Sequence, residues 1–152
     1  EGNCISTSAV VVKREFIEQV AGFSEAPDFI TAEDYELWLK LARVGARIGF
    51  VREILGEYLI HGGNQSRTAL RNMTAVMAVV QEHMSKQPNE SARQKLRMRR
   101  RRAIVYYSGA RGLQDSGQFR AAWPYFLKAL GEYPLVPKFY AAMALNACGR
   151  QP

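Results

Sequence analysis

The sequence predicts an α+β fold in which short strands and two helices are followed by an all-α tail of about four helices. Residues 1–67 alternate β-branched apolar runs with helical spacing, whereas residues 68–152 show apolar residues mainly at helical spacing. The charge changes at the same place. Residues 1–67 hold 7 Lys/Arg against 10 Asp/Glu, and residues 68–152 hold 14 against 4. We therefore expect two modules, 1–67 and 68–152.

The bulk composition is that of a globular protein. The chain has 152 residues, 47% of them hydrophobic and 23% charged, and its apolar runs are far shorter than the roughly 18 residues of a membrane span. Cys4 and Cys148 match no metal-ligand spacing, which favours free thiols in a reducing compartment. We expect a cytoplasmic protein. Because the chain starts with Glu1 directly in strand-like sequence, we also expect it to be a fragment of a longer protein.

The first module is expected to contain strands and helices in a defined order. Gly22 and Gly45 each follow an amphipathic stretch, where a left-handed residue ends a helix. Thr31 is a natural N-cap, and Asp34 follows three residues later, as in a capping box. The expected elements are a strand over 5–12, a helix over 13–21, a helix over 32–44, and strands over 47–51 and 56–61.

Four sequence motifs occur in this module in a fixed order: an asparagine-led strand from Asn3 to Val12, Ala21-Gly22-Phe23-Ser24-Glu25, Ala32-Glu33-Asp34-Tyr35-Glu36-Leu37-Trp38-Leu39, and His61-Gly62-Gly63-Asn64-Gln65-Ser66. Together they resemble the second half of family 2 glycosyltransferases of the GT-A fold. The resemblance covers about residues 1–67. It implies that this module is the acceptor-side, C-terminal half of a GT-A-like α/β domain.

The resemblance also implies roles for individual residues. Asp34 matches the base that deprotonates the acceptor hydroxyl, and Glu33 stands beside it to orient acceptor or base. His61 matches a histidine near the donor diphosphate or its metal ion. Tyr35 and Trp38 offer apolar faces to an acceptor sugar. Structural roles compete with these: Asp34 is also placed to complement the helix dipole, and the position of Trp38 on the apolar stripe favours core packing.

The implied reaction transfers a sugar from a nucleotide-sugar donor to a glycan or lipid-linked acceptor, with inversion and with Mg²⁺ or Mn²⁺. Such enzymes carry their nucleotide pocket and an Asp-x-Asp motif in an N-terminal half, and no Asp-x-Asp occurs in this chain. We therefore expect the isolated chain to be inactive and its parent to be a bacterial-type enzyme of cell-envelope polysaccharide synthesis.

The second module is expected to consist of helices over about 69–84, 91–113, 119–130 and 137–147. Residues 103–134 resemble one tetratricopeptide unit of the 34-residue type. The marker positions are Tyr106, Ala110, Leu113, Ala122, Phe126, Ala129 and Pro134. Because one repeat cannot bury its own faces, packing against the first module is favoured over a peptide-binding array. Pro124, inside the third of these helices, should bend it or mark a late start.

A basic run lies in the second of these helices. The candidates for contact with an anionic surface are Arg97, Arg99, Arg100, Arg101 and Arg102. One interpretation is attraction to anionic lipids at the inner face of the membrane, where lipid-linked acceptors reside. A solvated helix making ion pairs with the acidic first module is the competing interpretation. Nucleic acid is disfavoured, because aromatic residues do not interleave with the run.

Two function classes therefore remain for the chain. The first is part of a glycosyltransferase with Asp34 as its base. The second is a non-enzymatic, tetratricopeptide-like interaction module whose first part is only a support. Convergence of Asp34, Glu33 and His61 on an open concave surface would favour the enzyme, whereas burial of Asp34 against the tail helices would favour the interaction module.

Overall fold

A computed structural model of the chain describes residue 3 and residues 5–57, 69–86 and 91–150. In chain order its elements are the 3-10 turn η1 (Thr7–Ala9), α1 (Arg14–Gln19), the 3-10 turn η2 (Pro27–Phe29), α2 (Glu33–Arg43), α3 (Ala69–Ser85), α4 (Ala92–Asp115), α5 (Phe119–Glu132) and α6 (Pro137–Ala147). The helices expected from the sequence are confirmed.

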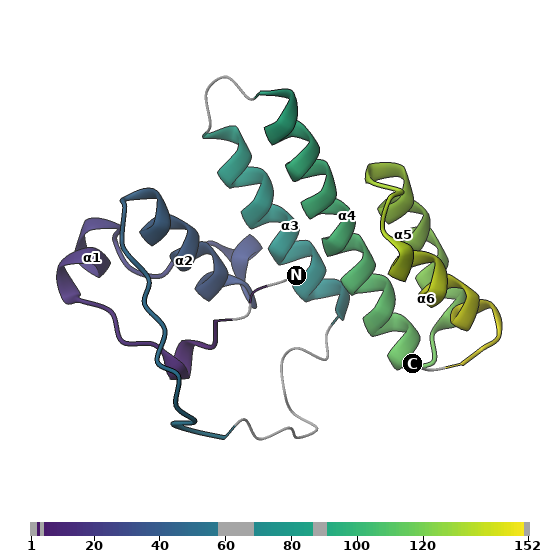
Figure 1. The fold of residues 1–152 in the computed structure, drawn as a ribbon, viewed down its shortest axis with the longest axis horizontal. Helices are drawn as coiled ribbons and strands as arrows, with labels where there is room; N and C mark the ends of the chain where they lie inside the picture. Colours follow the sequence, from purple (N-terminus) through teal and green to yellow (C-terminus); the bar gives the residue numbers. More distant parts are fainter. Residues whose placement is uncertain (1–2, 4, 58–68, 87–90, 151–152) are drawn as a thin grey trace.

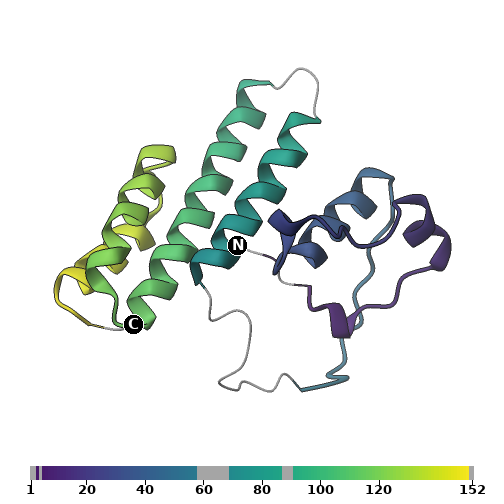
Figure 2. The ribbon, with the colours of Figure 1, turned by 180° about the vertical axis from the view of Figure 1, so that it is seen from behind.

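The antiparallel pair α3 and α4 forms the centre of the molecule (Figure 1). Helices α5 and α6 pack on one side of this pair, and α1 and α2 lie on the other side, as the opposite view also shows (Figure 2). Most of the long-range packing joins α4 to α5 and α3 to α4, while α2 and η2 rest on α3. Three layers of helices therefore run across the molecule.

The predicted α+β class is wrong for the described residues, which contain helices and no strand. Residues 5–12 form an irregular segment with the turn η1 at its middle, closed by the Ala9 N–H donating to the Ser6 carbonyl at 3.0 Å. Residues 47–51 and the described part of the expected last strand, 56–57, are also irregular. His61 and the rest of that strand lie outside the described residues.

The reason for this difference is the absence of a pairing partner among the described segments. A strand requires hydrogen bonds from a neighbouring strand and a second layer that covers its apolar face. Residues 5–12 bury part of their apolar surface on α2 instead, leaving Val11 fully exposed. The side chains of Ile48, Phe50, Val51, Ile54 and Leu55 are likewise exposed. Apolar, β-branched sequence is therefore present in the described segments without the sheet that it favours.

The N-terminal layer has a small core of its own. Leu37, Trp38 and Leu41 of α2 are buried against apolar side chains of the segment before α1 and of α1 itself. Gly22 and Gly45, which follow α1 and α2, have positive φ angles of 66° and 80°, as expected for residues that end helices. The α2 layer is thus built around one amphipathic helix and the chain that wraps it.

Small residues allow α3 and α4 to approach closely. A Cβ atom on Gly109 would lie 2.5 Å from Met73 Sδ, and one on Gly112 would overlap the Cβ of Ala69. Ala69 carries its Cβ directly on the backbone, so it cannot move aside as the end of a methionine can. The α3–α4 distance therefore depends most on Gly112.

Helices α4, α5 and α6 bury five of the seven residues that resemble tetratricopeptide markers, whereas Tyr106 is half-buried and Pro134 is exposed. Ala110, Leu113, Ala122 and Phe126 form one buried cluster, in which Phe126 is completely enclosed. The helix α5 continues through Pro124. Identity as a tetratricopeptide unit stays a prediction, whereas the close helix pairing that such small residues permit is observed.

We expect Gly112→Ala to lower the free energy of unfolding by about 1–3 kcal/mol, because an added methyl group overpacks a close helix contact. The matched control is Gly131→Ala in α5, where a Cβ would meet nothing within 4 Å. This control should stabilise the chain by up to about 1 kcal/mol through helix propensity. Urea unfolding followed by circular dichroism measures both. Equal stabilisation by the two variants would contradict the close contact.

Candidate functional site

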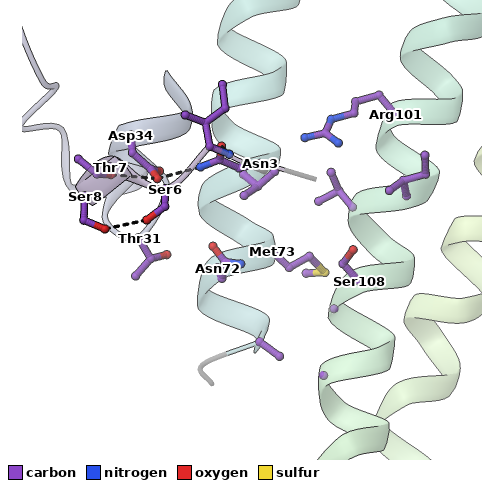
Figure 3. Close-up of a pocket in the computed structure, with 17 residues that line it drawn as sticks. Asn3, Ser6, Thr7, Ser8, Thr31, Asp34, Asn72, Met73, Arg101 and Ser108 are labelled. Carbon is purple, nitrogen blue, oxygen red and sulfur yellow. Dashed lines mark hydrogen bonds between the residues drawn. The ribbon is translucent and has the colours of Figure 1, made fainter. Parts of the chain in front are cut away.

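A groove of about 680 Å³ separates the start of α2 from the α3–α4 pair. The N-terminal segment and α2 supply one wall, and α3 and α4 supply the other (Figure 3). Its volume falls within the range of roughly 300–1,000 Å³ that is usual for small-molecule sites. Segments far apart in the sequence therefore form one concave surface.

Asp34 lies in the first turn of α2 and lines this groove. Its Oδ2 accepts a hydrogen bond from Asn3 Nδ2 at 2.8 Å and lies 3.4 Å from the Thr7 hydroxyl. Its Oδ1 accepts from the backbone N–H of Tyr35 at 2.6 Å. A carboxylate offers about four lone-pair positions, so a ligand hydroxyl can still approach. These contacts hold the carboxylate in one orientation.

The cap of α2 differs from the predicted capping box. Ala32 is the N-cap, and no side chain caps the helix. Thr31 has a φ of 87°, which is strained for a β-branched residue, and its backbone N–H donates to the Glu33 carboxylate at 2.7 Å. Thr31 is therefore not the N-cap. Glu33 stabilises this turn and is not among the residues that line the groove.

The opposite wall carries polar side chains from two helices. Asn72 of α3 and Ser108 and Arg101 of α4 line the groove together with the Met73 side chain (Figure 3). Gly109 and Gly112 line the same wall, and their lack of side chains lets α3 approach α4 closely there. Of the described lining residues, Asp34 and Arg101 alone are charged. The groove therefore has one acidic side and one basic side.

The two predicted acceptor-binding aromatics have other contacts. Trp38 is 8% exposed, packs in the core beneath α2, and donates from its indole N–H to the Ile5 carbonyl at 3.3 Å. Tyr35 packs with the α2–α3 contact, and the Arg101 guanidinium carbon lies 5.0 Å from the centre of its ring. Neither side chain lines the groove. Core packing accounts for Trp38.

The described residues do not test the metal-binding prediction, whose main ligands were expected in the N-terminal half of such enzymes. His61 lies outside them, and within the described ranges no group of three or more His, Cys, Asp or Glu side chains converges. Asp34 is the one carboxylate among the described lining residues. These residues do not by themselves fit a divalent cation, so Mg²⁺ or Mn²⁺ stays a prediction and no step is derived through it.

The arginine run is divided among different surfaces. Arg99 donates to the Gly131 carbonyl at 3.0 Å, and Arg102 pairs with the Glu132 carboxylate at 3.0 Å. Arg101 turns to the groove, while Arg97 and Arg100 are exposed. Contact with a membrane surface stays a prediction. None of the helices in the described ranges combines the length and hydrophobicity that a bilayer span requires.

Comparison with known families gives a match to Glycosyl transferase family group 2 over residues 4–145. The chain belongs to this family. No curated protein and no solved structure gives a match. The matched residues of the glycosyltransferase include both walls of the groove, so the helical region is part of the family match rather than outside it.

Sequence motifs pointed to Asp34 of the glycosyltransferase but did not indicate most of the residues that line the groove with it. Asn3 was noted only as the start of an expected strand, and Thr7, Asn72 and Ser108 had no signal of their own. Their contribution depends on which faces of α3 and α4 meet α2. The helical period places Asn72 and Ser108 on their own helices, but it does not identify the groove between them.

The far end of α2 in the glycosyltransferase is tied to α3. The Arg43 guanidinium donates to His83 Nδ1 at 2.6 Å and to the His83 carbonyl at 3.3 Å. Burial, and then the positive charge of Arg43, lower the pKa of His83 from its ordinary 6.5. Lys86 and Lys40 act in the same direction, and Glu82 opposes them. A neutral His83 therefore helps to hold α2 on α3.

We expect the free energy of unfolding of the glycosyltransferase chain to fall as the pH drops below about 6.5. The unfolded chain protonates His83 near that pH, whereas the folded state takes up this proton only at lower pH, so acid favours unfolding. His83→Gln keeps a hydrogen-bond acceptor for Arg43 but has no titrating group. This variant should therefore lose the part of the pH dependence that His83 contributes to the free energy of unfolding. Urea unfolding across the pH range measures the difference. If the free energy of unfolding varied with pH in the same way in the wild type and in His83→Gln, the assignment to His83 would be contradicted.

Proposed function

We propose that the chain supplies the acceptor side of a family 2 glycosyltransferase, with Asp34 as the base. The observation that carries this proposal is the placement of the Asp34 carboxylate, which lines the groove and is oriented by Asn3 and by the Tyr35 N–H. A base must be held within hydrogen-bond distance of the hydroxyl that it deprotonates. Family membership supports the sugar-transfer chemistry.

In the proposed reaction the acceptor hydroxyl enters the groove and donates a hydrogen bond to the Asp34 carboxylate. The hydroxyl oxygen attacks the anomeric carbon of a nucleotide-sugar donor and forms the new glycosidic bond, while its proton passes to the Asp34 carboxylate. The bond from the anomeric carbon to the diphosphate breaks, and its electron pair leaves with the diphosphate. Attack from the side opposite to the leaving group inverts the anomeric configuration.

The finer assignments belong to the same proposal. The acceptor is a glycan or a lipid-linked sugar, and the setting is polysaccharide synthesis at the cytoplasmic face of a bacterial envelope. Asp34 is half-buried in an open groove, which supports the enzyme over the non-enzymatic interaction module. The expected convergence of three residues is not part of this support, because Glu33 does not line the groove and His61 lies outside the described residues. Glu33 acts through the backbone at the start of α2, because its carboxylate binds the Thr31 N–H.

In the complete enzyme, we expect Asp34→Asn to reduce kcat by about 10²–10⁴-fold, the contribution that is usual for a general base. The affinity for the donor should change little, because Asp34 meets the acceptor. Asp28→Asn is the matched control, since it removes the same charge from an exposed residue of η2 outside the groove. Turnover with a radiolabelled nucleotide sugar measures both variants.

Wild-type turnover by Asp34→Asn would exclude Asp34 as the base. A similar loss in Asp28→Asn would show that the effect arises from general charge rather than from the groove. Circular dichroism of each variant establishes that the helices are retained, so a loss of turnover can be assigned to chemistry.

A further inference from the structure

Arg101 stands apart from the other described arginines of its run. Arg99 and Arg102 lie one turn apart on α4 and face α5, where both approach the Glu132 carboxylate. Residues two positions apart on a helix point to nearly opposite sides, so Arg101 points toward α2. There it lines the groove that holds Asp34 (Figure 3).

Tyr35 contacts Arg101 and helps to position its guanidinium. The guanidinium carbon lies 5.0 Å from the centre of the Tyr35 ring, within the range of a cation–π contact. The backbone N–H of the same Tyr35 donates to Asp34. One residue therefore orders both charged groups. A guanidinium that is already ordered loses less side-chain entropy when it binds an anion.

The wall that α3 and α4 supply suits a sugar. Asn72 and Ser108 provide an amide and a hydroxyl, which can pair with sugar hydroxyl groups. Met73 and the two glycines of α4 line the same wall and provide apolar surface. A ligand that spans this wall meets a carboxylate at one side and a guanidinium at the other.

We propose that the groove takes an acceptor sugar that carries an oxyanion, either a phosphate or a carboxylate, and that Arg101 binds this oxyanion. The planar guanidinium forms paired, charge-assisted hydrogen bonds with both kinds of oxyanion. The acceptor hydroxyl then faces Asp34, and Asn72 and Ser108 contact the sugar ring. This inference rests on the proposed function and adds the charge of the acceptor and the residue that recognises it.

The test is a titration of the isotopically labelled 152-residue chain, followed by amide chemical shifts. The probes are glucose 6-phosphate, glucuronate, the neutral methyl glucoside and inorganic phosphate. The variants are Arg101→Gln and, as the matched control, Arg100→Gln. Both substitutions remove one positive charge from adjacent positions of α4, but Arg100 is exposed and does not line the groove.

We expect at least one charged sugar to bind about tenfold or more tightly than methyl glucoside, with shifts at Asp34, Asn72 and Ser108. Arg101→Gln should abolish this preference, and Arg100→Gln should keep it. Whichever of glucose 6-phosphate and glucuronate binds more tightly identifies the preferred oxyanion.

Several results would overturn the proposal. One is equal affinity for the neutral and charged sugars, and another is an equal loss of affinity for the charged sugar in the two arginine variants. Binding of inorganic phosphate as tight as that of the sugar phosphate, or no chemical-shift change with either charged sugar at millimolar concentration, would also overturn it. Because the titration measures affinity without turnover, its failure is separable from a failure of Asp34→Asn in the kinetic assay.

Discussion

The packing of α2 on α3 is the contact on which the site depends. Ala32 at the start of α2 is almost completely buried against Ala75 and Val79 of α3. Small side chains at this junction bring the two backbones close together, and the first turn of α2 then lies beside the groove. The pair of Arg43 and His83 holds the other end of the helix. If α2 moved away from α3, the wall that carries Asp34 would separate from the wall that carries Arg101.

Helix geometry decides what the basic run does. In the sequence it is a single concentration of positive charge, and membrane attraction and ion pairing are both reasonable hypotheses for it. On α4 the side chains diverge, so Arg99 and Arg102 share Glu132 of α5 while Arg101 meets Tyr35 of α2. Two of its ion pairs thus lie between α4 and α5, whereas the competing ion-pairing hypothesis placed them between the run and the acidic first module. Net charge describes the run poorly, because neighbouring arginines face different partners.

The strand predictions failed for a reason that local sequence does not contain. Residues 5–12 and 47–51 have the β-branched, apolar character of strands, but a strand is stable only when a neighbour accepts and donates its backbone hydrogen bonds. Among the described residues no such neighbour is present. Helices form their hydrogen bonds within one segment. This is why the helix ranges, and the glycines that end α1 and α2, were predictable while the strands were not.

By itself, the sequence determined where the helices lie, the apolar stripe that carries Trp38, the motif around Asp34 and the family to which that motif pointed. These properties depend on residues within a turn or two of each other, or on a pattern kept in order along the chain. Only the tertiary structure decided that Glu33 binds backbone and that Asn72, Ser108 and Arg101 line the same groove as Asp34. Those outcomes depend on which helix faces meet and how closely, and small residues such as Gly112 and Ala32 set that approach through contacts between distant parts of the chain.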